Sequence, residues 1–224
     1  MCWEGGSLQM NWEQIPEWAQ AVAHSLLKAL KQRDAYTYGH SLRVAHHSQL
    51  LGEAAGLNAF DQRCVEFASL FHDLGKIGIP DSVLLKPARL DAYEEAIIRA
   101  HPIKSEDILG PLAHIPIFAS ALPGIRHHHE RIDGGGYPDG LIGEDIPLAS
   151  RIILISDTFD AMTTTRPYRA GLPFERAYKE LVQFAGTQFD FQLVKLFIRA
   201  HPTWKQMENE HVEEAVFGDL QRVA

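Results

Sequence analysis

Apolar residues recur along this chain at spacings of three and four positions, a pattern that predicts amphipathic helices. The first such pattern begins at Pro16 and ends at Arg33. The face that it predicts to be buried consists of Trp18, Val22, Leu26 and Leu30. No segment alternates between apolar and polar residues over the length of a strand, so the chain is expected to adopt an all-α fold.

The later predicted helices are separated by segments rich in glycine and proline. Their approximate ranges are 34–55, 61–73, 91–100, 101–110, 116–126, 150–164, 173–185 and 189–200. Loops are predicted at 75–80 and 133–143, where glycine and proline interrupt the helical pattern. The chain has 224 residues, which suffice for one domain with a sizeable buried core.

The overall charge and the cysteine content exclude several classes of protein. The formal net charge is −8 and no basic stripe is present, which argues against a nucleic acid polymer as a partner. The sequence contains no apolar run near the roughly 18 residues of a membrane span, and no signal peptide is recognisable. Two cysteines make no disulfide framework. These features predict a cytoplasmic protein.

The stretch from His72 to Asp81 is the strongest candidate for chemistry and reads HDLGKIGIPD. It follows an apolar helix face, where polar groups without partners cost roughly 2–7 kcal/mol. A metal ion would supply a partner, because imidazole and carboxylate are common metal ligands. Neighbouring helical residues diverge by about 100°. His72 and Asp73 would therefore converge only on a metal beyond the helix end, or through an Asp73 that bridges two metals.

A second stretch, from His127 to Pro138, reads HHHERIDGGGYP and includes three of the chain's 12 histidines. Together the two stretches resemble the HD-GYP family, a branch of the HD superfamily of metal-dependent phosphohydrolases. The family signature, HDxGK-IxIPD followed by HHExxDGxGYP, is intact here, and the resemblance covers roughly residues 34–201. It implies a single all-α, HD-type domain with a buried bimetal centre.

The resemblance implies seven metal ligands: His40, His72, Asp73, His101, His128, His129 and Asp157. Taken singly, most of these histidines are more typical of surface, capping or helix-boundary positions than of metal ligands. Asp157 is the hardest to explain without a cation, because a lone aspartate on an apolar helix face is unfavourable. The family motif aligns with the last two of the three consecutive histidines and leaves His127 as an outer neighbour.

Two divalent metal ions are expected, and iron or manganese suits the mixed ligands best, with nickel or zinc as alternatives. Some family members hold a third metal with a glutamate four residues before the first histidine. Tyr36 stands at that position here. A phenol with a pKa of about 10 is a poor substitute for a carboxylate at neutral pH, so a binuclear site is predicted.

The activity implied by the resemblance is hydrolysis of cyclic di-GMP to pGpG, with GMP as a further product. A hydroxide bridging the two metals would attack phosphorus. Asp73 would bridge the metals, and Lys76 would neutralise charge that develops on a phosphoryl oxygen. Lys76 lies one helical turn from His72, which favours this catalytic role over that of a surface lysine.

Substrate binding is assigned by the resemblance to Lys76, Tyr137, Asp160, Arg166 and Arg169. Asp160 would lie near a guanine, and the two arginines would bind phosphate or base edges, which arginine recognises bidentately. Tyr137 would stack on a base. The structural alternatives are salt-bridged loop arginines and a rigid turn around Tyr137.

Two alternatives to cyclic di-GMP hydrolysis stay open. One is a metal-containing cyclic-dinucleotide receptor with little turnover, and the other is a phosphodiesterase for a different cyclic dinucleotide, such as cyclic GMP-AMP. Partners implied by the family are GGDEF-type cyclase domains, through the GYP loop. The predicted division is a tail at 1–14, a packing or homodimer helix at 15–33, the HD-GYP catalytic domain at 34–201 and a C-terminal helical tail at 202–224.

Overall fold

The computed structural model describes residues 15–165 and 170–204, and within these ranges the fold is helical. The α-helices are α1 (Glu17–Arg33), α2 (Ala35–Ala54), α3 (Ala59–Phe71), α4 (Asp81–Leu84), α5 (Ala92–Ile98), α6 (His101–Leu109), α7 (Pro116–Arg126), α8 (Leu148–Thr163), α9 (Phe174–Gln183) and α10 (Phe191–Ala200). Short 3-10 helices are η2 (Leu74–Gly78), η3 (Gly110–Leu112), η4 (Gly143–Asp145) and η5 (His201–Thr203). Among the described residues, strand-like pairing is limited to one bridge between Ala185 and Phe189. The predicted all-α fold is confirmed.

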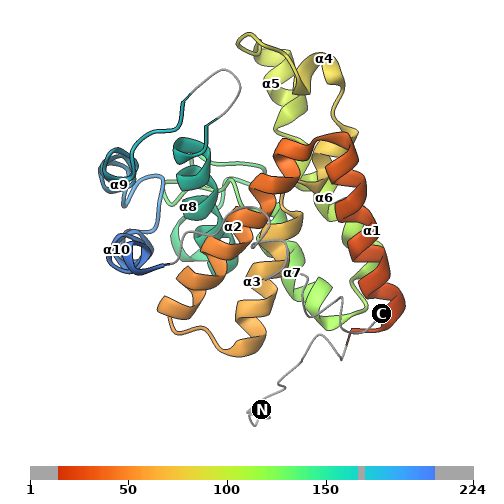
Figure 1. The fold of residues 1–224 in the computed structure, drawn as a ribbon, viewed down its shortest axis with the longest axis horizontal. Helices are drawn as coiled ribbons and strands as arrows, with labels where there is room; N and C mark the ends of the chain where they lie inside the picture. Colours follow the sequence, from red (N-terminus) through yellow and green to blue (C-terminus); the bar gives the residue numbers. More distant parts are fainter. Residues whose placement is uncertain (1–14, 166–169, 205–224) are drawn as a thin grey trace.

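Two hydrophobic cores lie side by side and share α8. The first core joins α1, α2, α3 and α7, and Ile153 of α8 reaches into it. The second core joins α8, α9 and α10, with Ile152 and Ile155 of α8 among its members. In Figure 1, α9 and α10 lie on one side and α1 on the other, with α2, α3 and α8 between them. The elements that carry the candidate site therefore stand at the junction of the two cores.

The first helix buries a face that overlaps only partly with the one predicted, since Leu30 is buried and Leu26 packs against the core. Its buried residues are Ala19, Ala23, Leu27 and Leu30. Trp18 is 51% exposed and Val22 is 38% exposed, so the prediction for these two side chains was wrong. Alanine side chains let α1 approach its neighbours closely, while the Trp18 ring stacks on the His114 ring with centroids 6.0 Å apart.

The predicted loop at 75–80 is also largely helical. Residues 74–78 form η2, and α4 begins at Asp81. Gly75 explains the tight packing of η2 on α6, because a Cβ there would stand 2.1 Å from the His101 carbonyl oxygen. The helix that leads into this segment begins earlier than predicted, since Asn58 rather than Asp61 caps α3 and accepts from the Asp61 amide.

The other predicted helices agree with the structure to within a few residues. Asp91 caps α5 in a capping box with Glu94, as the sequence suggested. No helix in the described part of the chain combines the length and the apolar character needed to cross a membrane. The predicted tail at 1–14 and most of the predicted tail at 202–224 lie outside the described residues.

Candidate metal centre

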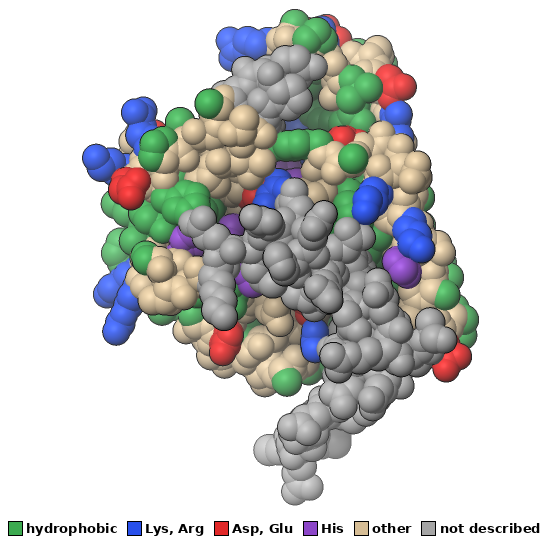
Figure 2. All heavy atoms as spheres, viewed as in Figure 1, with side chains coloured by type: hydrophobic (Ala, Val, Ile, Leu, Met, Phe, Trp, Pro, Cys, Tyr) green, Lys and Arg blue, Asp and Glu red, His purple; other side chains and the backbone are tan. Residues whose placement is uncertain are grey.

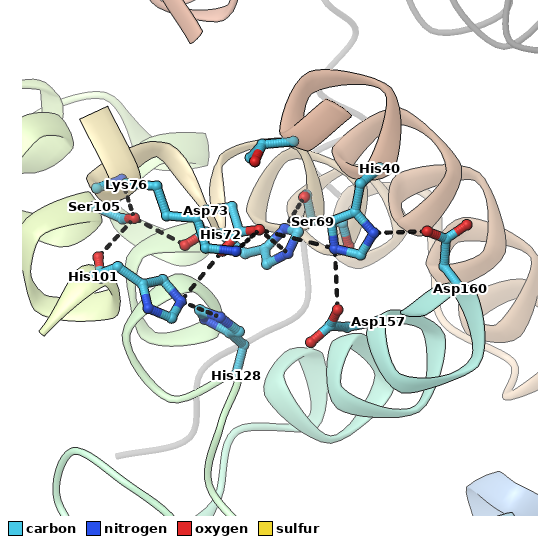
Figure 3. Close-up of polar contacts among 12 residues, drawn as sticks. His40, Ser69, His72, Asp73, Lys76, His101, Ser105, His128, Asp157 and Asp160 are labelled. Carbon is cyan, nitrogen blue, oxygen red and sulfur yellow. Dashed lines mark hydrogen bonds and ion pairs between the residues drawn. The ribbon is translucent and has the colours of Figure 1, made fainter. Parts of the chain in front are cut away.

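The seven predicted metal ligands come together in one buried cluster between α2, α3, α6, α7 and α8 (Figure 3). Their ligand atoms form three overlapping groups within each of which all atoms lie within 4.8 Å of one another. The groups are His101, His128 and His129; His40, His72 and Asp157; and His72, Asp73 and His128. A cluster of imidazoles and carboxylates of this kind can hold metal ions.

The end of α3 brings the two adjacent ligands of the HD motif together. His72 is the C-cap of α3, and Asp73 precedes η2, so the regular helix stops between them. The change of helix type offsets the divergence of about 100° expected of neighbours on one helix. The His72 Nε2 atom lies 3.4 Å from Asp73 Oδ2. A helix end thus provides the convergence that the sequence argument required.

Three of the cluster histidines are oriented by backbone carbonyls three residues earlier in the chain. The Nδ1 atom of His72 lies 2.6 Å from the Ser69 carbonyl oxygen. The corresponding distances are 2.7 Å from His101 to Ile98 and 2.6 Å from His128 to Ile125. A carbonyl oxygen only accepts, so each Nδ1 donates, and in the neutral ring each Nε2 presents a lone pair. This is how metal-binding histidines are usually held.

The Nε2 atoms of these three histidines lie close together, but none of them carries a proton for a hydrogen bond. Those of His101 and His128 are 3.2 Å apart, although neither neutral ring has a proton there. The Nε2 atom of His72 is buried and has no hydrogen-bond partner. Buried polar atoms are nearly always paired, and two facing lone pairs repel each other. The donor set therefore fits metal ions, which would accept all three lone pairs.

Asp73 occupies the centre of the cluster. Its Oδ1 atom lies 3.3 Å from His101 Nε2, while Oδ2 lies 3.8 Å from His40 Nε2 and 2.6 Å from Lys76 Nζ. The two carboxylate oxygens thus face different histidines. Such a carboxylate is suited to contacting two metal ions at once.

Burial and charge keep most of the cluster in the protonation states that metals prefer. Burial lowers the pKa of His101 to about 3 and that of His129 to about 4, and it lowers the pKa of His128 well below 6.5. Although burial opposes ionisation of Asp73, Lys76 and neighbouring histidines hold the pKa of its carboxyl well below the usual value. His40 differs: burial lowers its pKa, but Asp157 and Asp160 outweigh burial and raise the pKa to about 9.

Lys76 lies beside the cluster of histidines and aspartates, with its amine bonded to Asp73 and its side chain 24% exposed. A second polar group of this region, Ser105 of α6, was not singled out from the sequence. Its hydroxyl accepts from the Gly75 amide at 2.7 Å and lies 2.8 Å from the His72 carbonyl oxygen. The sequence feature that could have pointed to Ser105 is its position four residues after His101, on the same helix face.

Tyr137 packs over the cluster, and its ring contacts both His129 and Arg99. One face stacks on His129, with centroids 4.8 Å apart and an angle of 25°. The guanidinium of Arg99 lies over the ring, 5.1 Å from the centroid. These contacts are those expected of the packing role that the sequence left open for Tyr137.

The loop that carries Tyr137 is fixed by Glu130 of the same motif. The buried Glu130 carboxylate accepts from the backbone amides of Asp139, Gly140 and Leu141, at 2.7, 3.0 and 3.1 Å. His127 turns away from the cluster and bonds Asp139 through Nε2 at 2.8 Å. Its assignment as an outer neighbour is thus consistent with the structure.

The predicted substrate residues are only partly described. Asp160 is 2% exposed, and its carboxylate contacts His40 and Arg43, at the edge of the histidine and aspartate cluster (Figure 3). Arg166 and Arg169 lie outside the described residues. In a space-filling view, charged side chains are scattered over the face shown, and histidine side chains are visible among them (Figure 2).

Comparisons with known proteins agree with this geometry. Residues 24–193 match the family model described as HD domain. The chain is 36% identical over 200 residues to the cyclic di-GMP phosphodiesterase response regulator RpfG of Xanthomonas campestris pv. campestris, covering 89% of this chain and 53% of that protein. It is 34% identical over 171 residues to 3'3'-cGAMP-specific phosphodiesterase 3 of Vibrio cholerae, covering 76% of this chain and 36% of that protein.

The fold also matches a solved structure. The HDGYP protein Bd1817 from Bdellovibrio bacteriovorus aligns with a TM-score of 0.59 at 20% identity, over 73% of this chain and 51% of that one. The present chain spans about half the length of RpfG and about a third of the Vibrio enzyme. The match to the family model, the two intact motifs and the converging ligands together show that the chain belongs to the HD domain family, in its HD-GYP branch.

Proposed function

We propose that this chain is a metal-dependent phosphodiesterase that hydrolyses cyclic di-GMP to pGpG, with GMP as a further product. The observation that carries the proposal is the convergence of unprotonated imidazole nitrogens around the Asp73 carboxylate. The names of the relatives support it, because RpfG is named as a cyclic di-GMP phosphodiesterase. A receptor with little turnover is not favoured, since both curated relatives reported above are named as phosphodiesterases.

The proposed cofactor is a pair of divalent ions, iron or manganese, with nickel or zinc as alternatives. His101, His128 and His129 would hold one ion, and His40, His72 and Asp157 the other. Asp73 would contact both, since its two oxygens face the two histidine groups. When bound, such ions polarise a phosphoryl oxygen and activate water for attack on phosphorus.

Lys76 would act on the phosphodiester from the side of Asp73. Its amine is held 2.6 Å from Asp73 Oδ2 and its side chain is partly exposed, so it can reach a non-bridging phosphoryl oxygen. A cation at that position favours a transition state in which negative charge develops on the phosphoryl group. Arg166 and Arg169 are proposed to bind phosphate or guanine edges, as their sequence motif suggests.

Substrate choice is the point at which the two curated relatives differ. The Vibrio relative is named as specific for 3'3'-cGAMP, so cyclic GMP-AMP is the second candidate substrate. Both molecules present two phosphodiesters to the same metal centre, and discrimination must arise from contacts to the second base. Contact with GGDEF-type domains, homodimer formation through α1 and location in the cytoplasm stay predictions from the sequence.

The proposal is tested by purifying the protein anaerobically, measuring its metals by elemental analysis and separating the products formed from cyclic di-GMP and from cyclic GMP-AMP. We expect metal-dependent turnover of cyclic di-GMP that ends when a chelator is added. Asp73→Asn is expected to lose metal and hydrolysis while keeping the helical circular dichroism spectrum.

The matched control is Asp145→Asn, which makes the same change at an exposed position on η4. It should retain both metal and activity. Tight binding of cyclic di-GMP without turnover by the metal-loaded protein would favour the receptor alternative. Turnover of cyclic GMP-AMP alone would replace the proposed substrate and keep the proposed reaction.

A further inference from the structure

One histidine of the cluster is oriented differently from the others. His72, His101 and His128 each donate from Nδ1 to a backbone carbonyl in the last turn of a helix. Such carbonyls have no partner within their own helix and are free to accept. His40 lies inside α2, where the carbonyls of the preceding turn already accept from the helix backbone. Its Nδ1 therefore needs an acceptor from elsewhere.

Asp160 of α8 supplies that acceptor. Its Oδ2 atom lies 2.7 Å from His40 Nδ1 and 3.1 Å from Arg43 Nη2. Its Oδ1 atom accepts from Arg43 Nε at 2.6 Å and from the Thr164 hydroxyl at 3.0 Å. A carboxylate has about four acceptor positions, so these four contacts use all of them. With 2% of its surface exposed, Asp160 has no lone pair left for a guanine.

We infer that Asp160 is a positioning residue for the metal ligand His40, held in place by Arg43, and that it does not contact the nucleotide. The hydrogen bond to Nδ1 fixes the ring and directs Nε2 to the cluster, where this atom lies 3.0 Å from Asp157 Oδ1 and would lose its proton when a metal ion binds. This role rests on the proposed metal centre. It reassigns Asp160 from the substrate contacts that the sequence motif suggested.

Arg43 makes the arrangement specific to a carboxylate. Its guanidinium donates to both oxygens of Asp160, and it belongs to the same helix face as His40, three residues away. An amide at position 160 would turn its oxygen to Arg43 Nε and Thr164 and its NH₂ group to His40. His40 Nδ1 would then have to accept, which places the ring proton on Nε2 and blocks metal binding there.

The test is Asp160→Asn, with Asp145→Asn as the matched control at an exposed site. Metal affinity is measured by competition with a chromophoric chelator, using Mn²⁺ and Zn²⁺. We expect Asp160→Asn to bind metal about 10–100-fold more weakly, the range typical of changes behind a metal ligand. At saturating metal, KM for cyclic di-GMP should stay near the wild-type value.

A second readout follows the His40 ring itself. In the zinc-loaded wild-type protein, long-range ¹H–¹⁵N spectra of the histidine rings should show a proton on His40 Nδ1, assigned with His40→Gln. The Arg43→Gln variant leaves the Asp160–His40 bond in place and should weaken metal binding less than Asp160→Asn does. If Asp160→Asn does not fold, these two measurements still decide the question.

The inference about Asp160 and the proposed function would be overturned by different results. If the wild-type protein takes up no metal, the proposed metal centre fails. If it takes up metal, but Asp160→Asn binds metal normally and raises KM for cyclic di-GMP, then Asp160 contacts the substrate and the inference fails. The inference is also overturned if Asp160→Asn keeps both the metal affinity and the KM of the wild-type protein. A metal ion bound to His40 Nδ1 would overturn it as well.

Discussion

The Ser105 hydroxyl illustrates how one side chain holds two ligand-bearing segments together. It accepts from the Gly75 amide of η2 and lies within hydrogen-bond distance of the His72 and His101 carbonyl oxygens. All of these groups are buried. Removing the hydroxyl would leave the Gly75 amide without a partner in the interior.

Ser105→Ala is therefore expected to lower the free energy of unfolding by about 1–3 kcal/mol, the usual effect of an unsatisfied buried polar group. Urea denaturation of the metal-free protein measures this change. The control is Ser25→Ala on the exposed side of α1, where the hydroxyl bonds its own helix and little change is expected. Equal stability of wild type and Ser105→Ala would show that Ser105 does not stabilise the segments around His72 and His101.

At the residue scale, one local motif was enough to propose that His72, Asp73 and Lys76 act together, and the structure brings their side chains together. The groups that support this cluster were harder to predict. Asp160 was assigned to the substrate from the family resemblance. The sequence does not show that Arg43 and His40, on another helix, saturate its carboxylate.

At the scale of single elements, α1 shows where periodicity misleads. The large side chains Trp18 and Val22 follow a helical repeat, and so do the alanines one position later. The structure buries Ala19 and Ala23, because close approach to the neighbouring helices needs small side chains. The helix ends could be predicted from capping residues and from glycine and proline. The choice between two adjacent apolar faces depended on tertiary packing.

The buried face of α1 predicts that leucine has a larger effect on stability at position 23 than at position 22. Ala23→Leu adds bulk at a buried site and should lower the free energy of unfolding by about 1–3 kcal/mol. Val22→Leu makes a smaller change at a partly exposed site and should stay within about 0.5 kcal/mol. Chemical denaturation of the two variants compares them directly. The reverse order of stabilities would restore the face predicted from the sequence.

For the molecule as a whole, a second group of histidines makes stability depend on pH. His47 and His201 pack against Phe159, Phe197 and Trp204, with their own ring centroids 5.2 Å apart. Burial lowers the pKa of His47 to about 3 and that of His201 to about 4. Other charged groups near His47 are Asp160, His46 and Arg43.

The direction of this pH effect follows from proton binding. Unfolded histidines take up protons near pH 6.5, while the folded pair stays neutral, so the unfolded state binds more protons as the pH falls. The stabilising contribution of the pair is fully present above pH 6.5. It decreases towards pH 4 by at most about 1.4 kcal/mol per pH unit for each histidine.

His47→Leu removes one of these groups and should flatten the dependence of unfolding free energy on pH between 6.5 and 4. The proposed metal ligands also titrate in acid, so the comparison is made between variant and wild type in metal-free protein. His114→Leu, at an exposed position, serves as the control. An unchanged slope in His47→Leu would mean that His47 is not buried in its neutral form.

The central claim, that the histidine and aspartate cluster is a two-metal phosphodiesterase centre, is tested most directly by titrating metal into the metal-free protein. Mn²⁺ or Fe²⁺ is added anaerobically in known ratios to the chain, and hydrolysis of cyclic di-GMP is followed by product separation. We predict that the rate rises and reaches its plateau at two metal ions per chain, because Tyr36 replaces the carboxylate that a third ion needs. Absence of hydrolysis at every ratio, or a plateau at one or three ions, would contradict this account.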